Sequence, residues 1–585
     1  MAVSPGLHQA ATLSPMVSVL VLSFVIALLY QLYQWALPKP LPGIPYDAHA
    51  ARNLRGSLPD LLRYKEANGR IRPWFVEQII KHDSPLVQFW MLPFTKPIVI
   101  VSDYQETQDV LLRRSKEFDR GQRGADMFHG VVPNHHISMT STDPRFKGNK
   151  ELVRDLMTPT FLNEVSAPEI YSKTITLVGL WTLKAELAKE KPFDAKKDIV
   201  DATMDIINAA AFSFGDHMST TKHQLKHLSE LGQSQVVHGS DGAVRFLRLP
   251  EISDIAAISA VADHLGTQFR SMMPRLDHKI RMLTQPELRR NFARKDALIS
   301  REIAKSVMRF DNGDRTTFSA LDHLLHRERA AAQKANRKPV FHSPRIKDEI
   351  FGYVIAGHET SSTALQWTIK LLAGHQNVQT RLRSALQAAY RKAYDESRQP
   401  IVTEISNTTV PYLDAVIEES LRFDAPLPIF ARDTTRDTIL LGHRIPKGTQ
   451  VFFPVTGPSY KCPPFLIDDH SRSPTSREKH WGGQWSDDDT HLFNPERWLK
   501  IDENGGIVFD AQAGPVLAFG LGPRSCFGKR LAYLEMRIVL ALLVWNFEFK
   551  KLDGPFSSHQ PHDSITTMPL YCYVALKRLE HYQAS

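Results

Sequence analysis

The stretch Ala518–Met536, AFGLGPRSCFGKRLAYLEM, decides the fold that we expect for this chain. It places Cys526 in a glycine-rich bend, shortly before a helix-forming run that starts at Leu531. Gly520 and Gly522 allow positive φ angles and let the backbone approach a flat ligand closely. The helix N-terminus that follows favours a thiolate over a thiol. A lone cysteine is most often a small buried hydrophobe, but these neighbours indicate a thiolate that faces a ligand.

Other residues of the same bend support this interpretation. Arg524 offers a guanidinium suited to a carboxylate, two residues before the thiol. Pro523 stiffens the bend, and Gly528 leaves room after the sulfur. The bend therefore combines a sulfur ligand with a partner for an anionic group.

A long central helix is the second strong signal. Ser343 is a good N-cap, Pro344 suits the first turn, and the run continues to Ala373. Thirty residues at 1.5 Å each span about 45 Å, enough to cross a whole domain. The middle of this helix, AGHET at positions 356–360, is small and polar where a core helix should be apolar. It predicts either a functional segment or a packing kink. A zinc motif H-E-x-x-H is excluded, because Ser362 stands where the second histidine would be.

Two shorter motifs lie between these segments. Glu419 and Arg422 share one face of a helix predicted from Tyr412 to Phe423. The sequence PERW follows at positions 495–498. A Glu–Arg pair at this spacing is usually a solvated helix face, so neither motif alone decides a function.

Taken in order, these motifs resemble the cytochrome P-450 family. The pattern F-x-x-G-x-R-x-C-x-G is matched by Phe519, Gly522, Arg524, Cys526 and Gly528. The resemblance extends from about Lys39 to the C-terminus. It implies a mainly α fold with small β-sheets, in which haem lies between the central helix and the cysteine bend.

The resemblance also implies roles for individual residues. Cys526 would be the axial ligand of haem b, and Glu359 and Thr360 would deliver protons to dioxygen. Glu419, Arg422 and Arg497 would form an interlocked charge triad behind the haem. Residues expected to contact the haem or its propionates are Arg524, Arg432, Arg154, Lys150, Phe519, Gly520, Gly528, Ala356 and Gly357. Lys150 departs from the family pattern, which has tryptophan at this position and arginine four residues later.

The implied reaction inserts one oxygen atom from O2 into a small lipophilic substrate, with electrons from a separate NADPH-dependent reductase. The basic residues Lys529, Arg530 and Arg537 are candidates for the reductase-docking face. The resemblance favours fungal secondary metabolism, with a terpenoid or polyketide substrate. Two alternatives keep the haem, namely an isomerase or dehydratase without oxygen activation and a non-catalytic haem protein. A third treats Cys526 as a core residue.

Composition restricts the remaining function classes. The chain has 585 residues, a formal net charge of +9 and three cysteines. Three cysteines make no disulfide framework, which indicates a reducing compartment. The positive charge is scattered, so we expect no nucleic-acid partner.

The N-terminus predicts a membrane anchor. Met16–Leu37 is uncharged and long enough to cross a bilayer. A cleaved signal peptide fits less well, because no basic residue precedes the run. Lys39, Arg52 and Arg55 follow it and place the C-terminal side in the cytosol. We expect a short lumenal N-terminus at 1–15, the transmembrane helix at 16–37, a proline-rich linker at 38–57 and a catalytic domain at 58–585, on the endoplasmic reticulum membrane.

The rest of the chain gives coarser expectations. Strands are predicted at 86–90, 97–102, 437–441 and 450–453, a helix followed by an exposed loop at 290–336, and an irregular surface insertion at 457–489. Position along the chain suggests substrate contacts at 121–139, 427–430 and 566–568.

Overall fold

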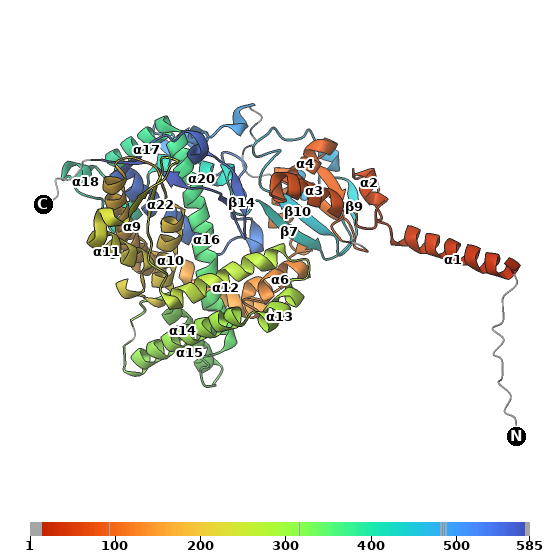
Figure 1. Ribbon diagram of the computed structural model, residues 1–585, viewed down its shortest axis with the longest axis horizontal. Coiled ribbons are helices and arrows are strands. Elements are labelled where there is room, and N and C mark those ends of the chain that lie inside the picture. The colour runs from red at the N-terminus through yellow and green to blue at the C-terminus, as the bar shows by residue number, and fades with distance from the viewer. Residues whose placement is uncertain are drawn as a thin grey trace, which may run out of the picture.

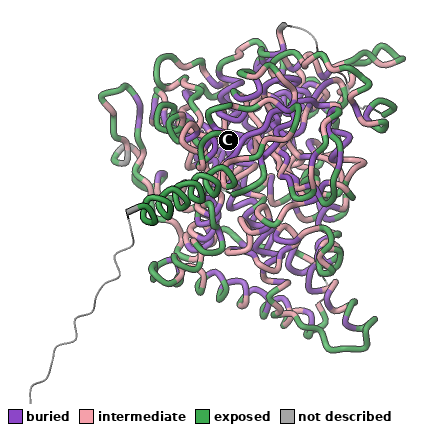
Figure 2. Tube along the Cα trace, turned by 90° about the vertical axis from the view of Figure 1, so that its right-hand side faces the viewer, coloured by how far each residue is buried: buried purple, intermediate pink, exposed green. Residues whose placement is uncertain are grey.

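The computed structural model describes residues 15–92, 94–314, 316–479, 483, 485 and 488–579. Helix α1 (Pro15–Ala36) projects from the body as a separate rod (Figure 1). Its span Met16–Ala36 has a mean hydropathy of 2.2 and buries no residue against the body. It is drawn as exposed along its length in Figure 2. The chain thus has one apolar N-terminal helix of membrane-spanning length, as predicted. Most of the expected lumenal segment lies outside the described residues.

The proline-rich linker after α1 is held by the catalytic body. Gln88 is buried in strand β1 (Leu86–Phe89), and its amide group donates to the carbonyls of Leu41 and Ile44 at 2.8 and 2.7 Å. Its side-chain oxygen accepts the Leu41 backbone N–H at 2.8 Å. One side chain therefore fixes the backbone of the linker by three hydrogen bonds.

Helices build most of the body, which confirms the mainly α prediction. They surround the long helix α16 (Pro344–Gly374), which runs through the middle of the molecule in Figure 1. The other helices of the body are α2 (Ala48–Ala51), α3 (Leu58–Asn68), α4 (Arg72–His82), α5 (Tyr104–Leu112), α6 (Gln122–His129), α7 (Pro144–Val153), α8 (Pro159–Phe161), α9 (Ala167–Ala188), α10 (Lys196–Phe212), α11 (Thr220–Leu231), α12 (Ser253–Arg270), α13 (Pro274–Thr284), α14 (Pro286–Asp311), α15 (Ala320–Lys334), α17 (Gln376–Ala389), α18 (Arg391–Asp395), α19 (Val402–Asn407), α20 (Pro411–Phe423), α21 (Pro474–Glu478) and α22 (Lys529–Asn546).

The start of α16 follows from its sequence. The Ser343 hydroxyl accepts the Ile346 backbone N–H at 3.3 Å, and Pro344 occupies the first turn. Nearly every residue of the helix is buried, which is typical of a helix enclosed on all sides. Its closest neighbour is α10, and the two helices approach at Gly357.

The largest sheet lies at the end of the body from which α1 emerges. Its strand order is β1-β2-β10-β7-β3; β2 and β10 are parallel, and the other pairs are antiparallel. A second sheet has the order β16-β4-β6-β5, and the other strands form two-stranded pairs. The remaining bounds are β2 (Ile98–Val101), β3 (Phe118–Asp119), β4 (Phe193–Asp194), β5 (Val236–His238), β6 (Val244–Phe246), β7 (Ile429–Thr434), β8 (Thr438–Leu440), β9 (His443–Ile445), β10 (Gln450–Pro454), β11 (Leu499–Ile501), β12 (Ile507–Phe509), β13 (Phe547–Phe549), β14 (Pro561–Asp563), β15 (Thr567–Pro569), β16 (Tyr573–Val574) and β17 (Leu576–Arg578).

One expectation about the middle of the chain is wrong. Positions 290–336 hold the end of α14 and all of α15, where we expected one helix and an exposed loop. Leu321, Leu324 and Leu325 of α15 are fully buried, so a narrow apolar stripe is enough to dock this charge-rich helix.

Candidate functional site

The cysteine bend has the backbone geometry that its glycines predict. Gly520 and Gly522 adopt φ angles of +61° and +71°. A Cβ on Gly522 would lie 1.9 Å from the carbonyl oxygen of Leu111 in α5, so only glycine fits there. The Cys526 backbone N–H donates to the Phe519 carbonyl at 2.8 Å, which closes the bend. Helix α22 begins three residues after the thiol.

The Cys526 thiol is exposed to solvent, although it is crowded by protein atoms. Burial raises the pKa of this thiol, while the Gly528 backbone N–H and Lys529 lower it. The helix terminus thus acts in the predicted direction, but burial outweighs it. A thiol that solvent reaches while protein surrounds it lies at the base of a hollow.

The other glycine and aromatic residues predicted around the thiol are close to it. Gly528 would place a Cβ 3.9 Å from the Cys526 sulfur. A Cβ on Gly520 would lie 3.5 Å from the Phe430 ring, so this glycine lets the ring pack on the bend. The Phe519 ring packs on Tyr533 of α22 with centroids 5.2 Å apart. These contacts fix the shape of the bend from both sides.

Helix α16 contributes an exposed alanine from within the protein. Ala356 is exposed, whereas the residues from Ile346 to Ile355 are almost all buried. Gly357 does not have the role that we predicted. Its Cβ would lie 2.5 Å from Ile207 of α10, so its missing side chain permits helix packing. The accessible surface on this helix belongs to Ala356 instead.

The acid–alcohol pair follows Ala356 in the next turn. The Thr360 hydroxyl donates to the Ala356 carbonyl at 2.7 Å, a back-bond that tends to bend helices. The Glu359 carboxylate accepts from Thr566, with its backbone N–H at 3.2 Å and its hydroxyl at 2.9 Å. Burial raises the pKa of Glu359. A protonated carboxyl and an alcohol therefore lie on the accessible turn of α16.

Basic side chains gather near the cysteine bend. Burial, with the charges of Arg524 and Arg432, lowers the pKa of Arg120 to about 9. Burial and Arg524 lower the pKa of Arg432 to about 10, and the same two causes lower that of Lys150. Arg524 has an acidic neighbour in Asp119, at 3.5 Å. Four mutually repelling cations with one such carboxylate form a site for an anionic ligand.

Lys150 and Arg154 behave differently, although both were predicted to face the site. The Lys150 ammonium donates to the Pro523 carbonyl at 3.3 Å, in the cysteine bend. Arg154 pairs instead with Glu151 at 3.0 Å, and its side chain is 61% exposed. The predicted contact of Arg154 with the haem site is therefore not formed.

The predicted charge triad is a pair. Arg422 forms a bidentate ion pair with Glu419 at 2.7 and 2.8 Å, and both side chains are fully buried. Glu419 also accepts from the Asn494 backbone N–H at 2.8 Å and from the Trp498 indole at 2.9 Å. Arg497 pairs with Asp489 at 2.7 Å rather than with Glu419.

Comparison with known proteins places this geometry in a family. The cytochrome P450 family model, written here as cytochrome P-450, matches residues 66–461 and 484–573, which is most of the chain. The chain belongs to the cytochrome P-450 family. The unmatched residues 462–483 lie within the irregular stretch that we interpreted as an insertion.

Several cytochrome P-450 monooxygenases match along nearly the full chain. TRI13 of Fusarium sporotrichioides is 35% identical over 96% of this chain and 99% of its own length. The xilC enzyme of Penicillium crustosum is 35% identical over 94% of both chains. The Hps1-dma1 cluster enzyme cyp3.1 of Dothistroma septosporum is 39% identical over 50% of this chain and 98% of its own length. This chain is accordingly a cytochrome P-450 monooxygenase.

Membership of the P-450 family implies a haem-thiolate centre, and the residues present fit one. The accessible thiol supplies the sulfur, and Ala356 offers a small side chain for a flat ring to approach. The guanidinium Nε of Arg120 lacks a hydrogen-bond partner among the described residues, although it is buried. An unpaired buried cation suits the two carboxylates of a haem.

Sequence reasoning missed three parts of this P-450 site. Arg120 directly follows strand β3, where no motif marks it. Glu535 of α22 is buried, accepts the Ser361 hydroxyl at 2.7 Å, and has its pKa raised by burial to about 8. Glu349 of α16 forms a cluster with His135 and His136. Only the burial of these polar residues reveals them, and sequence does not report burial.

The cluster around Glu349 is a structural clamp in the P-450 body. His135, His136 and Glu349 offer ligand atoms within 4.8 Å of one another. The carboxylate, however, accepts the backbone N–H and the ring Nδ1 of His136, both at 2.8 Å, and the Asn149 amide at 2.7 Å. Burial lowers the pKa of His135 to about 3, which keeps this ring neutral. The carboxylate thus joins segment 134–136 to α16.

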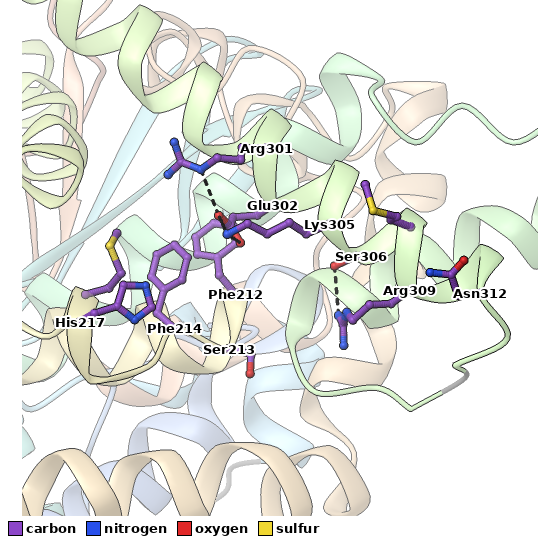
Figure 3. A pocket seen from close by; sticks show the side chains of 12 residues that line it. Phe212, Ser213, Phe214, His217, Arg301, Glu302, Lys305, Ser306, Arg309 and Asn312 are labelled. Atoms are coloured by element: carbon purple, nitrogen blue, oxygen red, sulfur yellow. Dashed lines mark hydrogen bonds and ion pairs between the residues drawn. The ribbon is translucent and has the colours of Figure 1, made fainter.

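A surface pocket of about 460 Å³ lies elsewhere in the P-450 body, between the end of α10 and the second half of α14 (Figure 3). Glu302 accepts from Lys305 at 2.9 Å and from Arg301 at 3.4 Å, so its charges are paired internally. Its lining includes none of the predicted site residues. It does not compete with the cysteine bend as the catalytic centre.

Proposed function

We propose that the chain binds haem b through the Cys526 thiolate and oxidises a small lipophilic substrate. The observation that carries this proposal is the exposure of Cys526 and Ala356, at the start of one largely buried helix and in the middle of another. When bound, haem with a thiolate ligand supplies the electron density that favours cleavage of the O–O bond of dioxygen. The protein must supply the sulfur, the orientation and the protons.

Orientation would come from the basic residues around the bend. Arg120, Arg432 and Arg524 would bind the propionates, because their charges are partly buried and repel one another. Lys150 would add a fourth cation at the position where the family pattern has tryptophan. Arg154 is left out of this set because of its exposure.

Proton handling would fall to Glu359 and Thr360. Because the Thr360 hydroxyl donates to the Ala356 carbonyl, its oxygen lone pairs remain able to accept a proton. Burial favours the protonated form of Glu359, which can then act as the acid. Both side chains come from one turn of α16, so the proton moves over a short path.

The substrate class follows less directly. We propose a role in fungal secondary metabolism, with a terpenoid or polyketide as substrate. Support comes from relatives in fungi, one of which carries a gene cluster in its name. Comparison of metabolites from cells with and without the gene would test this role. An unchanged metabolite profile under conditions of full expression would refute it.

Membrane attachment has two supporting features. Helix α1 would span the endoplasmic reticulum membrane once and leave the body in the cytosol, consistent with the basic residues after it. Helix α13 exposes Leu276, Ile280 and Leu283 on one face, which suits contact with the lipid surface. Protease protection of tags at either end in microsomes would test the orientation. A protected C-terminal tag would contradict it.

The reductase would dock where α22 begins. Lys529 and Arg530 are exposed at this end of the helix, close to the thiol. Arg537 is already paired with Asp414 at 2.5 Å and contributes less free charge. Charge reversal at Lys529 and Arg530 should slow reduction and weaken its salt dependence. Unchanged reduction kinetics would remove this face from consideration.

The decisive experiment concerns the sulfur. The reduced, carbon-monoxide-bound protein should show the Soret band typical of thiolate ligation, and Cys526→Ala should lose it. Variants of the other two cysteines, Cys462→Ala and Cys572→Ala, should retain the band. Retention of the band in Cys526→Ala would refute the assignment of the ligand.

A further inference from the structure

The Glu359 carboxyl group is held by a loop from the far end of the chain. Both of its hydrogen bonds to Thr566 fall on one oxygen, Oε1, at 3.2 Å from the backbone N–H and at 2.9 Å from the hydroxyl. Thr566 is fully buried and lies in the turn between β14 and β15. A glutamate side chain has several freely rotating bonds, so two bonds to one oxygen remove most of its freedom.

A second hydroxyl fixes Thr566 in turn. The Thr363 hydroxyl lies 2.9 Å from that of Thr566 and is also fully buried. Thr363 is four residues after Glu359, so both project from the same face of α16. The three side chains form a hydrogen-bonded chain that starts and ends on one helical turn. Because Thr363 and the Thr566 backbone both orient the Thr566 hydroxyl, it can point at Glu359 alone.

Charged groups face Glu359 from two further elements. Arg72 of α4 donates to the Thr567 hydroxyl at 2.6 Å, and its charge lowers the pKa of Glu359. Asp263 of α12 raises that pKa. The same turn packs on α12, since a Cβ on Gly266 would lie 3.2 Å from Ser564. The turn at 564–566 therefore lies between helix α12 and the carboxyl group.

We infer that Thr566 is a positioning residue, which holds the Glu359 carboxyl group in the orientation from which it delivers protons. This inference rests on the proposed role of Glu359 as the proton donor. Thr566 itself transfers no proton to the substrate. It sets where the acidic oxygen lies, and the contact of its turn with α12 ties that position to the helix above it.

The first test reads the carboxyl group directly. Difference infrared spectroscopy of the full-length haem protein follows protonation of Glu359 with pH, and Glu359→Gln identifies its band. Thr566→Val removes the hydroxyl but keeps the shape and the backbone N–H. Loss of a hydrogen bond to the charged form should raise the titration midpoint by roughly one pH unit, a tenfold change in the protonation equilibrium. Thr566→Ser should restore the original midpoint.

The second test measures proton delivery without a known substrate. With NADPH and a fungal P-450 reductase, dioxygen is reduced either to hydrogen peroxide, which takes two electrons and two protons, or to two waters, which takes four of each. Thr566→Val should raise the share of peroxide several-fold, because a misplaced carboxyl delivers the later protons slowly. Thr368→Val is the matched control. Thr368 is also buried on α16, but its hydroxyl bonds only the Ala364 carbonyl in the contacts described, at 2.8 Å.

The outcomes separate this inference from the proposed function. An unchanged infrared midpoint in Thr566→Val overturns the positioning role, whatever the peroxide share. If Glu359→Gln raises the peroxide share and Thr566→Val does not, the positioning role also fails and Glu359 keeps its function. If Glu359→Gln leaves the share unchanged, the proposed proton donor itself is wrong. A peroxide share that rises equally in Thr368→Val would assign the effect to loss of stability and overturn the inference.

Discussion

Two Glu–Arg pairs with the same spacing give a sharp test of how burial sets the strength of an ion pair. Arg422→Leu leaves Glu419 with two of its four N–H donors, and three backbone carbonyls lose their partner. Removing one member of a buried pair costs about 3–5 kcal/mol. Arg154→Leu breaks a pair with Glu151 at the same three-residue spacing, but at 61% and 52% exposure. That pair contributes about 0–1 kcal/mol.

Unfolding of the two variants in urea, followed by circular dichroism in detergent, measures the contrast. A domain is stable by about 5–15 kcal/mol, so Arg422→Leu should lose a large part of its stability and accumulate little haem protein. Arg154→Leu should unfold close to the wild-type midpoint. Equal midpoints for the two variants would refute the reasoning, because they would show that burial does not distinguish the two pairs.

Three further predictions concern the haem site and its surroundings. Gly522→Ala should reduce haem content sharply, because its methyl group would overlap the Leu111 carbonyl; normal haem content by pyridine haemochrome assay would contradict this. Arg120→Leu should speed the transfer of haem to apomyoglobin, whereas Arg154→Leu should not. The pKa of Glu535 is about 8 in the folded protein and about 4.3 in an unfolded chain. The folded state thus binds the extra proton, and stability should fall as pH rises between these values. Glu535→Gln should lack this loss when thermal midpoints are compared from pH 5 to 8.

The fold could be predicted where sequence signals are local. The cap at Ser343 fixes the start of α16, and the strands at Leu86–Phe89 and Ile98–Val101 lie within a residue of their predicted positions. The glycines around Cys526 also act locally, since a positive φ is a property of one residue. Such features depend on neighbours along the chain and need no knowledge of tertiary packing.

The misplaced residues depend on contacts between distant segments. Arg154 satisfies the spacing of its motif, but it lies at the end of α7, beyond the reach of the bend. Arg497 finds Asp489 nearer than Glu419. Gly357 faces α10 because of the rotation of α16, which the motif does not specify. A pattern of residue types identifies the segment that forms a site, whereas the direction of each side chain is set by the elements around it.

The grip of Gln88 on the linker has a consequence for encounters in the membrane. A body on a loose tether would tumble, and most collisions with a membrane-bound electron donor would present the wrong side. Three hydrogen bonds to the chain just beyond α1 couple the body to its anchor, so both would rotate together about the bilayer normal. The search for a partner is then reduced to lateral diffusion and one angle, and a single glutamine far from the iron helps to decide how many collisions are productive.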